Sequence, residues 1–311
     1  MMELYIKENK LISYDEWRNI LQGIRLLTKE QEDYKELLAK TIEQAILKRA
    51  QHLQAQKKNI GVFLSGGVDS ALITYILAKN KIPITAYTVA FMDGNYQEPK
   101  DIAYAKKLSQ ELGIKQVLLT LNIDTAEALA KTTASILKEQ TSALSLGVGM
   151  VEVAALQEAQ VHNIDALFAG LGAEELFAGY QHHAQADNIN ESCWQGLHKM
   201  HDRDLKRDVA IGAHFNIALP TPFLDEELIE LAMSIAGEEK VRKHQGIVQK
   251  KYCLRQAAEL LGLNQEFVWR PKLAAQYGSR MDDAIYKVAK KHNMSKQAYI
   301  EQLLEQHTKA L

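Results

Sequence analysis

The stretch Ile60-Gly61-Val62-Phe63-Leu64-Ser65-Gly66-Gly67-Val68-Asp69-Ser70 is the most informative part of this 311-residue chain. Its first five residues are an apolar run typical of a buried strand, and a helix-like run from Ala71 to Lys79 follows. A strand that ends in two glycines leaves backbone N–H groups free to converge on an anion, and the next helix adds the positive end of its dipole. The stretch therefore predicts a phosphate site within a strand–loop–helix unit.

The loop does not end in the Lys-Ser or Lys-Thr pair of the Gly-x-x-x-x-Gly-Lys phosphate loop, so transfer of a terminal phosphoryl group is not expected. Ser65 to Ser70 resembles instead the Ser-Gly-Gly-x-Asp-Ser pyrophosphate loop of enzymes that cleave ATP between its α and β phosphates. The alternative is a Gly-Gly turn followed by a helix-capping serine. We favour the pyrophosphate loop because all six residues stand between a strand-like run and a helix-like run.

Strand-like and helix-like runs alternate through the first half of the chain. The strand-like runs are Ile60–Leu64, Ile84–Phe91, Gln116–Leu121 and Asp165–Ala169, and the helix-like runs are Tyr34–Gln54, Ala71–Lys79, Asp101–Leu112 and about Gly149–His162. This order predicts an α/β fold with a doubly wound, mostly parallel sheet of the pyrophosphate-loop type, covered by helices on both faces. Ligands of such sheets bind beyond the carboxyl ends of the strands. The glycine-bearing loops after Leu64 and Ala169 both fall there, so they are expected to share one ligand.

The second half of the chain is predicted to be a helical layer, because the strand signal disappears after Tyr180. Residues 1–33 are expected to form an amino-terminal extension with a short hairpin at Leu4–Ile12 and a capping helix. Residues 34–311 are expected to form one compact unit, with a nucleotide-binding α/β part at 34–180 and a helical part at 181–311. The helices expected in that part include Glu226–Ala236, Val248–Leu261 and Met281–His292.

Composition bounds the class of protein. A formal net charge of −2 with 47% hydrophobic residues indicates a globular chain with a large core. The longest apolar run, Ala143 to Leu156, is interrupted by Glu152 and falls short of the roughly 20 residues that span a bilayer. The amino end has no basic, apolar signal segment, so a cytoplasmic protein is expected. The two cysteines, Cys193 and Cys253, stand too far apart to predict a disulfide framework or a zinc ribbon.

The second glycine-bearing loop runs from Ala169 to Tyr180 and reads AGLGAEELFAGY. Its residues, and its position about a hundred residues after the first loop, resemble the asparagine synthetase family, which has Ser-Gly-Glu-Gly-Ser/Ala-Asp-Glu-Leu-Phe-Gly-Gly-Tyr there. The resemblance covers about residues 35–290 and is strongest to the divergent asparagine synthetase domain-containing branch. Further matching segments are Arg207-Asp208, Pro222-Phe223-Leu224-Asp225, Lys251 through Arg255 with Ala257, Arg270-Pro271-Lys272, and Gln276 through Arg280.

The resemblance implies that ATP and Mg²⁺ are cofactors and that Asp69, Glu174 and Lys272 are catalytic. Carboxylates that hold Mg²⁺ commonly help to neutralise a pyrophosphate leaving group, and Asp69 and Glu174 match the family's metal-holding acids. The alternative for Glu174 and Glu175 is a pair of acids that favours a helix N-terminus. Lys272 is implied to neutralise charge on the α-phosphate and pyrophosphate. Without the resemblance, its surroundings would be taken for an ordinary surface loop.

The nucleotide is expected on both glycine-bearing loops. The resemblance implies that Leu64, Val89 and Gly170 contact the adenosine part through backbone and packing. The other residues expected to bind the cofactor are Ser65, Gly66, Gly67, Asp69, Ser70 and Ala169.

The chain departs from the family at four places, and three of them, all except Glu174, affect the second half of the reaction. Leu171 stands where the family has a glutamate credited with handling the proton during amide formation, and leucine offers no lone pair for that task. Ala218-Leu219-Pro220 replaces the family's Glu-x-Arg, and Glu174 replaces an aspartate. The chain also begins Met1-Met2-Glu3, without the nucleophilic cysteine of a glutaminase domain. Nitrogen is therefore expected from ammonia, from another amine or from a separate glutaminase subunit.

The leading hypothesis is an ATP-dependent ligase that forms AMP and pyrophosphate by adenylating a small-molecule carboxylate for attack by ammonia or an amine, as in amino-acid biosynthesis. One alternative is a tRNA-modifying enzyme; nucleic acid is not favoured, because the basic stretch from Lys240 to Arg255 is expected to be a solvated helical face. The other is a non-catalytic nucleotide-binding subunit. His182-His183 is expected at solvent or edge positions and not at a metal. A membrane is not expected, and a homodimer is left open.

Overall fold

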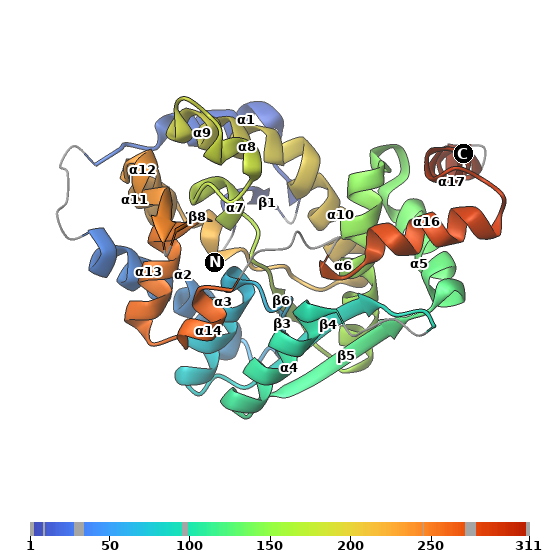
Figure 1. The fold of residues 1–311 in the computed structure, drawn as a ribbon, viewed down its shortest axis with the longest axis horizontal. Helices are drawn as coiled ribbons and strands as arrows, with labels where there is room; N and C mark the ends of the chain where they lie inside the picture. The colour runs from blue at the N-terminus through green and yellow to red at the C-terminus, as the bar shows by residue number, and fades with distance from the viewer. Residues whose placement is uncertain are drawn as a thin grey trace.

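A computed structural model describes residues 3–8, 10–27, 34–94, 99–244, 246–270 and 278–308. Its centre is a four-stranded sheet in which every pairing is parallel, with the order β5-β4-β3-β6 (Figure 1). The strands are β3 (Ile60–Phe63), β4 (Ile84–Phe91), β5 (Lys115–Leu121) and β6 (Ala166–Phe168). The chain moves outward from β3 to β5 and then returns to the other side of β3. The order therefore reverses between β3 and β6, and such a switch point is where doubly wound sheets bind ligands.

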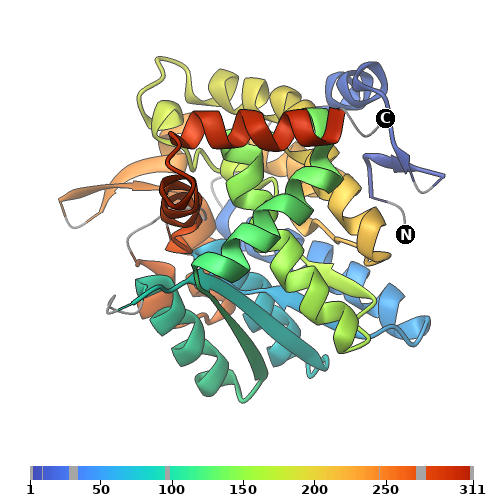
Figure 2. The same cartoon turned by 90° about the vertical axis from the view of Figure 1, so that its right-hand side faces the viewer.

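Helices cover both faces of this sheet, as the sequence predicts. Strand alternation sends Ile60 and Val62 into one buried apolar cluster, with α2 and α3, and sends Tyr87 and Val89 into a second cluster, with α5 and α6. Figure 2 shows α5 and α6, in green, above the strands. The helix after β5 was not predicted, and α6 begins six residues earlier than expected. These helices are α2 (Tyr34–Ala55), α3 (Val68–Lys79), α4 (Lys100–Leu112), α5 (Ile123–Leu137) and α6 (Ala143–Val161).

The second half of the chain is mostly helical, with one correction. The helix expected at Val248–Leu261 begins only at Tyr252, because an antiparallel hairpin precedes it: β7 (Val241–His244) pairs with β8 (Ile247–Lys250). Gly246 turns the hairpin with φ +80°. The helical elements are α7 (Ala173–Leu176), α8 (Gln181–Ala184), α9 (Ile189–Met200), the π-helical turn η2 (His201–Leu205), α10 (Lys206–Phe215), η3 (Pro222–Leu224), α11 (Glu226–Ser234), α12 (Gly237–Lys240), α13 (Tyr252–Leu261), α14 (Gln265–Val268), α16 (Met281–Lys291) and α17 (Lys296–Thr308).

The amino-terminal segment forms the predicted hairpin and helix. Strands β1 (Ile6–Lys7) and β2 (Lys10–Leu11) pair antiparallel, and α1 (Tyr14–Gly23) follows with a capping box at its start. Trp17 is fully buried, and its indole Nε1–H donates to the carbonyl of Leu197 at 2.9 Å. The segment thus contributes to the same apolar core as the sheet, while the boundary at residue 33 stays a prediction. None of the helices in the described ranges is both long and apolar enough to cross a membrane.

Candidate active site

The first loop has the geometry of a tight anion-binding turn. Gly66 has φ +72°, and a Cβ built on it would lie 2.9 Å from the carbonyl oxygen of Asp101, so a larger residue is excluded by both strain and space. The Ser65 N–H donates to Oγ of Ser70 at 3.2 Å, and the two hydroxyl oxygens lie 3.1 Å apart. Helix α3 begins directly after the loop, so the N–H groups of its first turn, which have no partner within the helix, lie beside these hydroxyls.

The second loop packs directly against the first. A Cβ built on Gly170 would lie 3.1 Å from Cβ of Asp69. Gly172 has φ +93° and faces Leu224 so closely that a built Cβ would lie 2.6 Å from its Cδ2 atom. The N–H of Ala169 donates to the carbonyl of Pro220 at 3.0 Å. The two loops therefore meet at the switch point of the sheet, as expected for segments that share a ligand.

Asp69 and Glu174 converge on one cation, the ammonium group of Lys251. Lys251 Nζ donates to Oδ2 of Asp69 and to Oε1 of Glu174, each at 2.6 Å, and its side chain is 2% exposed. Burial alone would lower the pKa of Lys251, but the two carboxylates outweigh burial and raise it above its ordinary value. The lysine is therefore charged at neutral pH and holds both acids at one point.

The backbone brings Lys251 to this point in an unusual conformation. Lys251 is the residue before α13 and has φ +56°, and its N–H donates to the carbonyl of Phe177 at 3.1 Å. A Cβ built on Gly179 would lie 1.9 Å from Oε2 of Glu174 and 2.4 Å from Cε of Lys251. The small residue at position 179 is thus a condition of the contact between the acid and the lysine.

Arg270 is a second cation at the first loop. Its Nη1 atom donates to the carbonyl of Gly66 at 2.7 Å, its Nη2 atom forms an ion pair with Asp101, and its guanidinium lies 4.6 Å from the centre of the Tyr104 ring. Burial raises the pKa of Asp101, and Arg270 opposes that rise. The loop backbone is therefore fixed from its outer side by a buried ion pair.

Lys272 lies outside the described residues, but both flanks of its segment are placed. Arg270 precedes it at the first loop, and the Ser279 carbonyl accepts a hydrogen bond from the N–H of Phe91 at 2.8 Å. Phe91 ends β4, so Arg270 and Ser279, which stand on either side of the undescribed residues, both lie at the carboxyl edge of the sheet.

A small cavity of about 50 Å³ lies at this edge, and Leu64, Ser65, Val89, Val151 and Ser279 are among the residues that line it. Three of these five are sequence-predicted nucleotide contacts. Ligand pockets usually measure about 300–1,000 Å³, so an adenosine group would enter only if the walls separate. A larger cavity of about 510 Å³ lies at the amino ends of β3 and β4, away from both loops.

Two secondary expectations need correction. His182 is exposed as predicted, but His183 is fully buried, with its ring centre 4.3 Å from that of His182. No group of three or more metal-ligating side chains occurs within the ranges that the structure describes. The basic stretch is not one solvated helical face, because Lys240, Lys251 and Arg255 are buried.

Sequence reasoning did not identify Lys251 and the Arg270–Asp101 pair as parts of the site. Lys251 and Arg270 belong to segments that match the family, and that match was the available signal for them. Leu171, the apolar replacement for the family's glutamate, is partly buried and packs against the first apolar cluster.

The fold and the two loops define a nucleotide-binding α/β protein of the pyrophosphate-loop type. The family model for asparagine synthase matches residues 38–194 and 181–310, so the chain belongs to the asparagine synthase family. A Methanocaldococcus jannaschii protein described as a glutamine-hydrolysing asparagine synthetase is 28% identical over 94% of this chain and 60% of its own length. The asparagine synthetase of Gallus gallus is 27% identical over 85% of this chain and 46% of its own length.

The chain thus spans between 46% and 60% of the length of these two relatives. Solved structures with a similar arrangement are more distant. The NMN synthetase of Francisella tularensis aligns with a TM-score of 0.44 and 15% identity over 86% of this chain and 93% of its own. The NAD+ synthetase of Burkholderia pseudomallei aligns with a TM-score of 0.42 and 14% identity over 96% and 97%.

Proposed function

We propose that the chain is an ATP-using ligase that activates a carboxylate, or a similar oxygen, as an adenylate and releases pyrophosphate. The observation that carries the proposal is the convergence of Asp69 and Glu174 on Lys251 beside the first loop. A cation held between two acids next to unpaired helix N–H groups can stabilise the charge that develops on a leaving pyrophosphate. Membership of the asparagine synthase family supports the same chemistry.

Asp69 and Glu174 would hold Mg²⁺ on this proposal. The residues fit the ion, because hard oxygen ligands suit it and Oδ1 of Asp69 is buried with no hydrogen-bond partner within the described part of the chain. When bound, Mg²⁺ would supply positive charge that offsets the negative charge of the phosphates. The chain's own contribution is to orient the triphosphate through the first loop and to place Lys251, and on this proposal also Lys272, against it.

The acceptor half of the reaction is proposed only as attack by ammonia or another amine. Position 171 cannot accept the proton that such a nucleophile loses, because its side chain is a leucine packed in an apolar cluster. The identity of the acceptor is left open, and a separate glutaminase subunit stays one proposed source of nitrogen.

The test is ATP–pyrophosphate exchange with a panel of carboxylates. Asp69→Asn removes one of the two acids on Lys251, and we expect the exchange rate to fall by about a hundredfold or more, as for loss of a preorganised electrostatic group. Asp165→Asn is the matched control, because Asp165 also forms an ion pair with a lysine, Lys58 at 2.8 Å, but before β6 at the opposite end of the sheet. Exchange that survives in the Asp69 variant would refute the assignment.

The same assay separates the two alternatives. Exchange that appears only when RNA is added would favour a nucleic-acid acceptor. The buried positions of Lys240, Lys251 and Arg255 leave that alternative a smaller basic surface than the sequence suggests. Binding of ATP without exchange for any acceptor would favour a non-catalytic nucleotide-binding subunit.

A further inference from the structure

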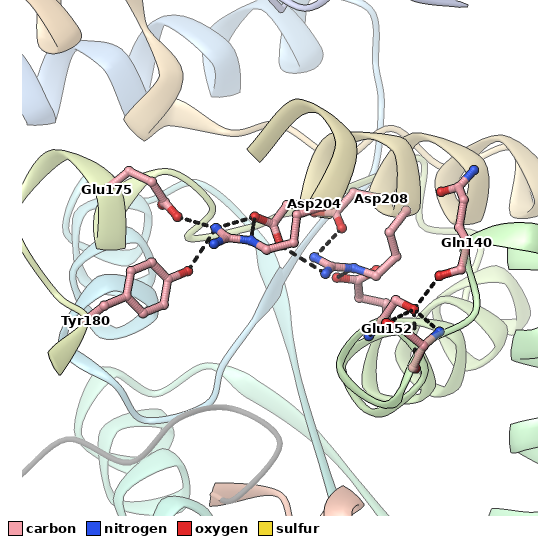
Figure 3. Close-up of polar contacts among 10 residues, drawn as sticks. Gln140, Glu152, Glu175, Tyr180, Asp204 and Asp208 are labelled. Atoms are coloured by element: carbon pink, nitrogen blue, oxygen red, sulfur yellow. Dashed lines mark hydrogen bonds and ion pairs between the residues drawn. The ribbon is translucent and has the colours of Figure 1, made fainter. Parts of the chain in front are cut away.

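A network of mostly buried charged side chains, here called the charge network, links the second loop to helix α6 (Figure 3). Glu175, next to Glu174, accepts from Nη2 of Arg203 at 2.6 Å, and Nε of Arg203 donates to Asp204 at 2.7 Å. Asp204 in turn accepts from Nη1 of Arg207 at 3.1 Å. Arg203 and Asp204, in the middle of the charge network, lie on the π-helical turn η2, and such turns occur often at functional sites.

The charge network ends, away from the second loop, in a pair of carboxyl groups, Glu152 on α6 and Asp208 on α10. Arg207 Nη2 lies 2.6 Å from Oδ1 of Asp208, and Arg207 Nε lies 3.3 Å from Oε1 of Glu152. The Nε atom has no aligned hydrogen bond to Glu152, and Oε2 of Glu152 has no partner within the described ranges. Arg207 therefore lies closer to Asp208 than to Glu152, and it forms an aligned hydrogen bond with neither.

The positive and negative charges of the charge network do not balance. Four carboxyl groups, those of Glu152, Glu175, Asp204 and Asp208, face two guanidinium groups. All four carboxyl side chains are at most 12% exposed. Buried ionised carboxylates in excess of their cations are strongly disfavoured, and this favours a neutral carboxyl group at Glu152 or Asp208.

The pair of carboxyl groups at the end of the charge network is the place where one proton fits. Glu152 and Asp208 both contact the guanidinium group of Arg207, and Oε2 of Glu152 and Oδ1 of Asp208 are buried without a hydrogen-bond partner within the described ranges. Two such carboxyl groups can form a hydrogen bond with each other only when one of them is protonated. Burial raises the pKa of Glu152 well above its ordinary value, and Asp208 raises it further; the opposing effect of Arg207 does not offset them. Burial also raises the pKa of Asp208, and Arg207 opposes that rise. The other titratable groups that act on the pair are Asp204 and Tyr5.

We propose that Glu152 and Asp208 share one proton inside the folded chain, and that neutral Glu152 is a positioning residue that leaves Asp208 to hold Arg207. Through Asp204 and Arg203, Arg207 supports Glu175 and so the loop that carries Glu174. Val151, adjacent to Glu152, lines the cavity beside Leu64 and Val89. The shared proton therefore acts between two walls of the candidate site. Its effect on activity rests on the proposed function, whereas its effect on folding does not.

The test compares wild type with Glu152→Gln, because glutamine keeps a hydrogen-bond donor and removes the proton equilibrium. A group whose pKa is raised on folding loses stability as pH rises from its unfolded value, about 4.3, to its folded value. Across that window we expect the unfolding constant of wild type to rise by up to tenfold per pH unit relative to that of the variant. Urea unfolding at pH 5, 6, 7 and 8 measures this ratio.

Two further variants make the result specific. Glu158→Gln on the same helix is the matched control, because Glu158 is 36% exposed and its one ion pair within the described ranges is a 3.6 Å contact with His162; this variant is expected to follow wild type. Asp208→Asn removes the charge that Arg207 needs, so its unfolding midpoint is expected to fall at every pH. In ATP–pyrophosphate exchange, Glu152→Gln is expected to keep the alkaline part of the kcat/KM profile that wild type loses.

The outcomes separate the two proposals. A Glu152→Gln chain that is less stable than wild type at pH 7 to 8 would show that Glu152 is an ionised partner of Arg207 and would overturn the inference. A wild-type pH dependence in Glu152→Gln would overturn it as well. Absence of exchange in wild type would count against the proposed function alone, since the unfolding comparison still decides whether the pair holds a proton.

Discussion

Replacement of Gly179 by alanine tests the central contact of the site by space alone. A Cβ at this position would lie 1.9 Å from Oε2 of Glu174 and 2.4 Å from Cε of Lys251, whereas real Cβ atoms essentially never approach other heavy atoms within 3.0 Å. The carboxylate of Glu174 must therefore move by at least about 1 Å, or the backbone of the loop must move instead. Gly179 has an ordinary negative φ, so backbone strain does not contribute.

Two magnitudes follow from this displacement. A misplacement of about 1 Å in a catalytic group can cost about a hundredfold in rate, so we expect ATP–pyrophosphate exchange to fall by about that factor. Overpacking typically costs about 1–3 kcal/mol of stability, and the lower entropy of the unfolded alanine chain returns about 0.4–1 kcal/mol. The free energy of unfolding is therefore expected to fall by only about 0–2.5 kcal/mol, and the chain stays folded.

The matched control is Gly23→Ala at the end of α1, where a built Cβ meets nothing within 4 Å. That variant is expected to keep full exchange and wild-type stability, or to gain up to about 1 kcal/mol from helix propensity. Exchange and urea unfolding are measured on all three proteins. If Gly179→Ala keeps exchange within twofold of wild type, then the close contact of Glu174 with Lys251 is not needed for the reaction and the reasoning fails.

Two predictions concern buried charges outside the catalytic contact. Lys240 is fully buried, and the one hydrogen-bond partner of its amine among the described residues is the sulfur of Met233, at 3.6 Å. Burial lowers the pKa of Lys240, so the unfolded chain binds the proton more tightly, and the stability of the folded chain rises with pH up to about 10.5. Lys240→Met should abolish that rise and add about 1–3 kcal/mol to the free energy of unfolding at pH 7. Urea unfolding at pH 7 and 9.5 measures both effects. Arg49 joins Glu3 and Asp225 at 2.8 Å each. Arg49→Met should cost about 3–5 kcal/mol by the same measurement, because both carboxylates lose their buried cation and Asp225 keeps only the longer, 3.4 Å pair with Lys48 within the described ranges. A loss below 1 kcal/mol would contradict this.

The sheet and its ligand edge were predictable from local sequence. Apolar runs such as Ile60–Leu64 are long enough to indicate strands, and the glycines that follow mark where each strand must turn. The hairpin at β7–β8 was missed because its exposed Ile247 and Val248 face solvent and continue without a break into a helical pattern. A two-stranded ribbon buries little, so it leaves no apolar alternation to read.

Lys251 shows why the site could be predicted only in part. Its two carboxylate partners lie 182 and 77 residues away along the chain, and no local pattern encodes such a contact. The sequence pattern shows Glu152 only as a polar residue that interrupts an apolar run. The pattern correctly indicates its helix, but it does not indicate which residue lies near it in the fold. That residue, Asp208, lies on α10, which packs against α6 only in the folded molecule.

The position of Lys251 also constrains how a cation and a nucleotide could enter together. Two carboxylates and one ammonium leave a single negative charge at the point where Asp69 and Glu174 meet, and Mg²⁺ alone would change that net charge to +1 beside a buried lysine. A triphosphate supplies the missing negative charge, while the lysine can turn from the acids to a phosphate oxygen. On the proposed assignment, therefore, metal and nucleotide enter as one unit. The lysine holds the acids together until then, and its charge offsets the repulsion between the two partly buried carboxylates in the absence of ligand.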